Sequence, residues 1–223
     1  MRISRRLKQI EQMITQDYDH IWDCCCDHGL LGLSLLEREV VAKVHFVDAV
    51  APLMAELEQR LLKHSGALNS PERWQVHCMD LARLRLPVTD KLQRHLIIIA
   101  GVGGDLIVDL VLAILEAHPG QPLEFLLCPV HHNYKVRQAL AAEGLGLVDE
   151  VLVKEKGQFY EVMHVSKGAP QSLSPVGSLM WDLSRDADRD YLNRTIAHYE
   201  RRSIKDQKVL SIVQAYQALL SDS

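Results

Sequence analysis

Short, continuously apolar runs alternate with longer stretches of helical character along most of the chain. Five of these runs are predicted to be strands: Ile21–Cys25, Val44–Val47, Val76–Cys78, Leu96–Ala100 and Glu124–Cys128. Helix-like stretches lie between or after them, at Pro52–His64, Asp105–Ala117 and Asn133–Glu143. Because the strands are continuously apolar and helices separate them, the pattern predicts an α/β fold with a mostly parallel sheet covered on both faces.

Two further β-like segments end this alternating region. Leu147–Lys154 and Phe159–Ser166 are joined by a short turn at residues 156–158, and they predict an antiparallel terminal hairpin. With this hairpin the expected sheet is Rossmann-like and has seven strands.

The composition shifts at Lys167–Pro175, which is rich in proline, serine and glycine and predicts a linker. Beyond the linker, Asp186–Arg202 is predicted to be one helix. A second helix is predicted from apolar residues at helical spacing, which are Val209, Ile212, Val213, Tyr216, Leu219 and Leu220. We therefore expect a main domain at residues 1–167 and a linker with a small helical hairpin at residues 168–223.

The net charge of −4 excludes a global basic field, so any nucleic-acid contact must use local basic patches. The basic N-terminus is not followed by an apolar run, so we expect no secretory signal. The most apolar window is interrupted by Asp105 and Asp109, and this argues against a membrane span. A cytoplasmic protein is the resulting expectation.

The stretch WDCCCDHGLLG at residues 22–32 raises the question of a metal or redox site. Zinc sites use cysteines about two to four residues apart, and adjacent strand residues point to opposite faces. The three adjacent cysteines therefore fit small buried hydrophobic residues better than metal ligands, and no metal is expected.

Acidic residues follow three neighbouring strands, at the edge where open parallel sheets bind ligands. Asp48 ends the second predicted strand and suits a ribose, while Asp80 follows the third and suits an adenine amino group. Asp23 and Asp27 flank the first strand end, where they suit a cationic group, and Gly29 gives that turn freedom to approach a ligand. A turn or helix cap is the alternative role for Asp48 and Asp80.

The turn after the first strand lacks the leading glycines of a dinucleotide-binding G-x-G-x-x-G motif, because only Gly29 and Gly32 are present. This disfavours a nicotinamide cofactor. S-adenosylmethionine is an adenosine-containing cofactor without a pyrophosphate, so it does not need that motif.

The chain also resembles a known family along nearly its whole length. The motifs that carry the resemblance are S-R-R-L at residues 4–7, D-C-C-C-D-H at 23–28, I-A-G-V-G-G at 99–104, L-C-P-V-H-H with an arginine at 127–137, and E-K-G-Q-F-Y-E at 155–161. They are similar to motifs of the TrmK family, bacterial enzymes that methylate N1 of adenosine 22 in the D-arm of tRNA. Cys25 departs from the family pattern, which has glycine at this position, and Val130 replaces an asparagine.

The resemblance implies a class I methyltransferase that uses S-adenosylmethionine, acts on tRNA and has a shortened C-terminal coiled coil. The implied cofactor-binding residues are Asp23, Cys25, Asp27, His28, Asp48, Asp80, Ala100 and Gly101. The implied catalytic residues are Asp27, Gly101, Gly103 and Gly104. Expected RNA contacts are Arg2, Arg5, Arg6, Lys8, His132, Arg137, Arg201, Arg202 and Lys205.

Two alternative functions remain open on the sequence. One is a methyltransferase for another RNA or for a small molecule, and the other is a catalytically silent RNA-binding module on the same fold. The basic residues of the C-terminal helices, and His131 with His132, also fit ordinary solvated surfaces.

Overall fold

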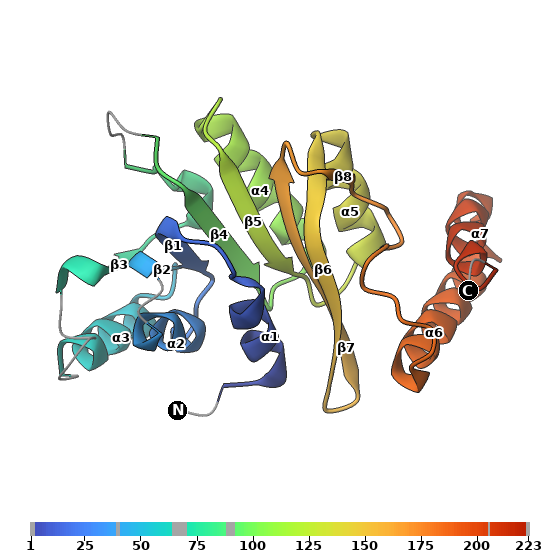
Figure 1. The fold of residues 1–223 in the computed structure, drawn as a ribbon, viewed down its shortest axis with the longest axis horizontal. Coiled ribbons are helices and arrows are strands. Elements are labelled where there is room, and N and C mark those ends of the chain that lie inside the picture. The colour runs from blue at the N-terminus through green and yellow to red at the C-terminus, as the bar shows by residue number, and fades with distance from the viewer. Residues whose placement is uncertain (1–2, 39–40, 64–70, 88–91, 205, 222–223) are drawn as a thin grey trace.

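The computed structural model describes residues 3–38, 41–63, 71–87, 92–204 and 206–221 (Figure 1). These residues form one eight-stranded sheet in the order β3-β2-β1-β4-β5-β7-β6-β8. The strands are β1 Tyr18–Cys24, β2 Val41–Asp48, β3 Trp74–Cys78, β4 His95–Ala100, β5 Leu123–Cys128, β6 Leu145–Glu155, β7 Gln158–Lys167 and β8 Gln171–Ser172. The first five pair in parallel, and β7 returns antiparallel to β5 and β6.

The helices are α1 Arg5–Met13, α2 Leu30–Glu37, α3 Ala51–Lys63, α4 Gly104–Ala117, α5 Asn133–Ala142, α6 Asp186–Ser203 and α7 Leu210–Ala218. Short 3-10 turns lie at η2 Pro71–Arg73, η3 Leu81–Arg83 and η4 Gln207–Val209. Among the helices in the described part of the chain, none combines the length and apolar character that crossing a membrane requires.

This architecture confirms the predicted Rossmann-like sheet with its antiparallel hairpin, and two details differ. The predicted linker carries the two-residue strand β8, which pairs with β6 and adds an eighth strand. Helix α2 was not predicted, because its sequence LLGLSLLE is apolar on nearly all sides and shows no helical periodicity.

Alternate residues of each strand enter two apolar layers, one on each face of the sheet. Ile21, Val44 and Phe46 pack in one layer, with residues of α1, α2 and α3. Trp22 and Ile97 pack in the other, with residues of α4 and α5. The sheet is thus covered on both faces, as its apolar strands require.

The C-terminal helices have an apolar cluster of their own, formed by Leu192 and Ile196 of α6 with Val213 and Tyr216 of α7. Figure 1 shows α6 and α7 side by side at the end of the chain, beyond the edge of the sheet. The helical hairpin is therefore present as expected, while the domain boundary at residue 167 stays a prediction.

A row of histidines crosses the first strands on the face that carries Trp22. His45 lies 2.9 Å from His20 through one ring nitrogen and 2.9 Å from His77 through the other. The Trp22 ring stacks on His45 with 3.7 Å between centroids, and its indole N–H donates to His95 at 3.2 Å. Burial lowers the pKa of His45 to about 2 and that of His95 to about 4, so both rings are neutral in the folded protein.

One buried arginine joins the edge of the sheet to the C-terminal segment. Arg137 of α5 has no exposed surface, and its guanidinium lies 2.6 Å from Glu150 and 2.8 Å from Glu161. Glu150 also accepts a hydrogen bond from the Leu179 N–H at 2.7 Å, and the Tyr191 hydroxyl donates to Glu161 at 2.7 Å. Although burial opposes it, the Arg137 charge lowers the pKa of Glu150, so the group is a true ion pair.

Replacing Arg137 with methionine is expected to lower the free energy of unfolding by about 3–5 kcal/mol, because Glu150 and Glu161 become uncompensated buried charges. Urea denaturation followed by circular dichroism measures this change. The matched control is Arg83→Met, an exposed position where a change within about 0.5 kcal/mol is expected. Equal effects of the two substitutions would contradict the stabilising role of the buried ion pairs.

Candidate active site

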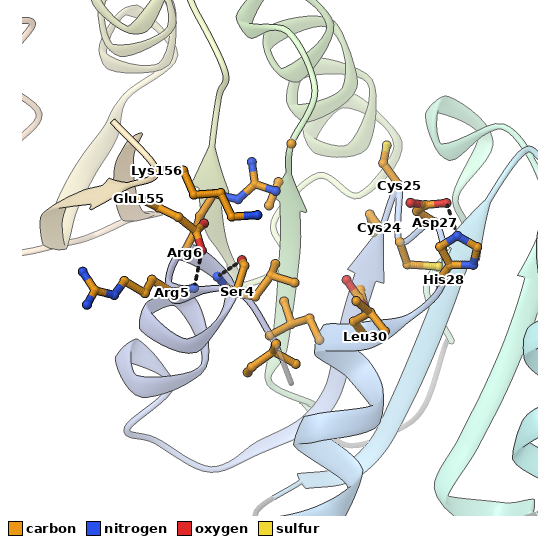
Figure 2. Close-up of a pocket in the computed structure, with 17 residues that line it drawn as sticks. Ser4, Arg5, Arg6, Cys24, Cys25, Asp27, His28, Leu30, Glu155 and Lys156 are labelled. Carbon is orange, nitrogen blue, oxygen red and sulfur yellow. Dashed lines mark hydrogen bonds and ion pairs between the residues drawn. The ribbon is translucent and has the colours of Figure 1, made fainter. Parts of the chain in front are cut away.

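A cavity of about 880 Å³ opens at the carboxyl ends of β1 and β4. Helix α1, the turn between β1 and α2, and the tip of the β6–β7 hairpin surround it (Figure 2). The polar and charged side chains in its lining are those of Ser4, Arg5, Arg6, Asp23, Cys24, Cys25, Cys26, Asp27, His28, Glu155 and Lys156. This is the edge of a parallel sheet at which ligands bind in open α/β folds.

The turn after β1 is held by two carboxylates. Asp23 accepts a hydrogen bond from the Gly32 N–H at 2.8 Å, which ties the strand end to the first turn of α2. Asp48, at the end of β2, accepts from the Asp27 N–H at 3.0 Å. Gly32 must stay small, because a Cβ there would lie 2.3 Å from the Phe46 ring.

Asp23 is a buried carboxyl at the back of the cavity, with 5% of its surface exposed. Burial raises its pKa to about 7, nearby Asp48 adds to the rise, and the hydrogen bond from Gly32 opposes it. A cationic ligand group beside Asp23 would favour its ionised form. The site therefore holds an acid that is poised to change charge near neutral pH.

The glycine loop after β4 has little room for side chains. Gly101 has a φ of +84°, and a Cβ there would lie 3.3 Å from the Arg6 guanidinium. A Cβ on Gly103 would lie 2.8 Å from the His131 ring, and one on Gly104 would lie 2.6 Å from the His131 carbonyl oxygen. Glycine is thus required for the close contact between this loop and the loop after β5.

Arg6 points into the cavity from helix α1. Ser4 caps that helix by accepting from the Leu7 N–H at 3.2 Å, so the first turn is fixed at the cavity wall. The Arg6 guanidinium lies 4.9 Å from the centre of the Tyr160 ring, and its buried Nε has no hydrogen-bond partner among the described residues. The sequence predicts Arg6 in an outer RNA-binding patch, whereas the structure places it in the lining of the cavity.

The other predicted cofactor residues divide into two groups. Cys25, Asp27, His28, Ala100 and Gly101 line the cavity together with Asp23, and Asp27 lies 3.7 Å from His28 at its exposed rim.

Asp48 and Asp80 are not part of the cavity lining. Asp80 caps η3 by accepting from the Ala82 N–H at 3.0 Å, and Asp48 also accepts from the Val50 N–H at 3.0 Å. Asp80 thus caps a turn and Asp48 holds the two turns beside it, while their contacts with a cofactor stay predictions.

The predicted RNA contacts also lie in different places. Arg137 is wrong as an RNA contact, because it is fully buried and paired with two glutamates. His132 is exposed, and its Nδ1 lies 2.7 Å from Asp105. Arg5 lies at the cavity, with its N–H donating to Glu155 at 2.8 Å. The other predicted RNA contacts that the structure describes are Lys8, Arg201 and Arg202, and all three are exposed. Arg2 and Lys205 lie outside the described residues.

Sequence reasoning missed the contribution of the β6–β7 hairpin to the cavity. Glu155 and Lys156 line it from the turn, and Figure 1 shows this tip extending beyond the other strands. The length of β6, which is 11 residues, is the signal that could have shown the reach of this hairpin.

The cysteines are chemically quiet in this setting. Burial, with Asp48 and Asp23 adding to it, raises the pKa of the Cys25 thiol to about 11, and burial also raises the pKa of Cys26. Both thiols are therefore protonated at neutral pH and are poor nucleophiles and metal ligands. Within the described residues, no three His, Cys, Asp or Glu side chains are grouped in a way that would hold a metal ion.

Cys25 has a φ of +52°, in the left-handed region that favours glycine. Cys25→Gly is expected to stabilise the fold by about 1 kcal/mol, because relief of this strain exceeds the cost of added chain flexibility. Cys26→Gly is the matched control, since both cysteines are half-buried against the core and only Cys25 has a positive φ; Cys26→Gly should destabilise by about 1 kcal/mol. Urea denaturation compares them, and a loss of stability in both variants would show that Cys25 is not strained.

Comparison with solved structures places the whole chain in one known fold. A Streptococcus pneumoniae protein proposed to be a tRNA (m1A22) methyltransferase is 21% identical, with a TM-score of 0.78 over 98% of this chain and 100% of that one. The m1A22 tRNA methyltransferase TrmK of B. subtilis is 19% identical, with a TM-score of 0.78 over 97% and 98% of the two chains. TrmK of M. capricolum, solved with S-adenosylhomocysteine, is 13% identical, with a TM-score of 0.75 over 98% of each.

The TM-scores establish a common fold, and the coverage includes the C-terminal helices. None of the curated proteins compared with the chain matches it significantly. A family model described as a methyltransferase domain matches residues 3–163, which contain all five parallel strands and the whole cavity lining. The chain belongs to this methyltransferase-domain family.

Proposed function

We propose that this protein transfers a methyl group from S-adenosylmethionine to N1 of adenosine 22 in the D-arm of tRNA. The observation that carries the proposal is the similarity over the entire chain, C-terminal helices included, to structures of TrmK enzymes. Membership of the methyltransferase-domain family supports the reaction type independently of those structures. A tRNA substrate also implies a cytoplasmic location.

The residues of the cavity fit S-adenosylmethionine. A volume of about 880 Å³ falls in the range of small-molecule sites, which is roughly 300–1,000 Å³. Buried Asp23 suits the cationic amino group of the cofactor, and the Arg6 guanidinium with its unpartnered Nε suits the carboxylate. Gly101 leaves room beside the Arg6 guanidinium, because it has no side chain. When bound, the cofactor supplies an electrophilic methyl group on its sulfonium.

The protein groups at the cavity rim suit a reaction that needs positioning more than proton transfer. N1 of adenine carries a lone pair, so no base has to remove a proton before methyl transfer. The methylated base is cationic, and Asp27 at the exposed rim is the acid that we propose to stabilise this charge. Gly101, the residue of the 101–104 loop that lines the cavity, has no side chain, which suits a flat base turned out of the tRNA.

Methyl transfer from labelled S-adenosylmethionine to unmodified tRNA transcripts tests the proposal directly. N1-methyladenosine, identified by mass spectrometry of the nucleosides, is the expected product. A transcript with guanosine in place of adenosine 22 is the matched control and should accept no methyl group. Transfer to neither transcript, or equal transfer to both, would overturn the assigned substrate position.

Cofactor affinity is expected to depend on pH through Asp23. The pKa of this carboxyl is about 7 in the free protein, and a cationic ligand favours its ionised form. Affinity should therefore fall as pH decreases from 7 to 5.5, by up to about tenfold per pH unit, and should level off above pH 7.

Calorimetric titration of S-adenosylmethionine across this range measures the dependence. Asp23→Asn should bind more weakly and lose the pH dependence, whereas Asp17→Asn, at an exposed position, should keep the wild-type profile. The same slope in Asp23→Asn and wild type would rule out Asp23 as the titrating group.

A further inference from the structure

A second hollow lies between the main domain and the C-terminal hairpin. This groove, of about 340 Å³, runs between α5 on one side and α6, η4 and α7 on the other. It is lined by His132, Tyr134, Lys135, Gln138, Tyr199, Arg202, Val209 and Ile212. Its floor is apolar and its rim is basic, and it is separate from the cavity at β1 and β4.

The charge of the groove is opposite in sign to that of the chain as a whole. No carboxylate belongs to the described lining, although the chain has a net charge of −4. Lys135 and Arg202 are exposed on opposite walls, and His132 stands at one end. Nearby Asp105 pairs with His132 and Lys135 from outside the lining and holds both at the rim, at 2.7 and 2.5 Å. The described lining thus has two basic side chains and no carboxylate, which suits an anionic group such as a phosphate.

Aromatic rings stand beside these cations. The Tyr134 and Tyr199 rings meet edge to face with 6.2 Å between centroids, and Tyr199 stacks on Tyr216 at 5.8 Å. The Arg202 guanidinium carbon lies 5.9 Å from the centre of the Tyr199 ring. A guanidinium held near an aromatic ring offers a surface for a base together with a charge for a phosphate, which is how proteins bind unpaired RNA.

The groove is also connected to the proposed catalytic loop. His132, at one end of the groove, has its Cβ 3.2 Å from the position of a Cβ on Gly104. Neighbouring His131 contacts Gly103 in the same way, with its ring at 2.8 Å. Gly101, at the start of that loop, lines the first cavity. The loop at residues 101–104 is therefore the wall between the two sites.

From this geometry we propose that the groove binds one unpaired nucleotide of the RNA substrate, next to the base that enters the catalytic cavity. Tyr199 and the guanidinium plane of Arg202 contact its base, and the charges of Arg202 and Lys135 contact its phosphate. This inference rests on the proposed function and extends it, because it assigns RNA binding to the junction between α5 and α6.

The test measures binding of unmodified tRNA by fluorescence anisotropy over a range of salt concentrations. Arg202→Gln removes a cation from the groove, and Gln138→Glu adds an anion at an exposed lining position with almost no change in shape. Each is expected to raise the Kd for tRNA about three- to tenfold, and Arg202→Gln should reduce the salt slope by about 1. Gln59→Glu on α3 is the matched control and should bind as wild type.

Two further measurements separate the nucleotide site in the groove from the proposed function: titration of the variants with S-adenosylmethionine, and methyl transfer by the wild type. Unchanged cofactor affinity in both groove variants, with weaker tRNA binding, supports the groove. Wild-type tRNA affinity in both variants overturns it and leaves the methyltransferase assignment intact. If the wild type neither binds nor methylates tRNA, the proposed function and the proposed nucleotide site in the groove are both overturned.

Discussion

A buried positive charge organises one side of this molecule. Arg137 has no contact with solvent, so its charge has to be balanced inside the protein, and Glu150 and Glu161 do so from two adjacent strands. Each glutamate has a further partner in the C-terminal segment, at Leu179 or Tyr191. The need to balance the buried charge of Arg137 therefore fixes α5, β6, β7 and the start of the helical hairpin relative to one another.

The candidate active site depends on the same elements. Strand β7 carries Tyr160 beneath Arg6, and the end of β6 carries Glu155, which accepts a hydrogen bond from the Arg5 N–H. Helix α1 is thus positioned by the hairpin, and the hairpin is positioned by the ion pairs of Arg137. The parallel strands supply the opposite wall of the cavity, with Asp23 at its back. The site is therefore assembled from two parts of the chain that are stabilised by different kinds of interaction.

The sequence predicted the parts of the structure that depend on local pattern. Apolar strands and helical spacing located the sheet, and the position of Asp23 at a strand end indicated the cavity. Helix α2 was missed because burial on nearly all sides removes periodicity. Arg137 was misplaced for another reason, since arginine in a sequence indicates a surface. Its burial depends on Glu150 and Glu161, and the position of half-buried Arg6 at the cavity depends on Tyr160. These partners lie far along the chain, so no local pattern reveals them.

The histidine row sets a limit on the conditions under which this fold persists. His45 and His95 are neutral in the folded protein, but in the unfolded chain each takes up a proton below a pH of about 6.5. Unfolding in acid is therefore coupled to proton uptake, so stability is lost progressively as pH falls from about 6.5 toward 4 for His95 and toward 2 for His45. Neither ring belongs to the cavity lining, which lies at the carboxyl ends of β1 and β4. The protein thus carries this acid sensitivity outside the cavity, and mild acid acts on its folding through side chains that take no part in the site.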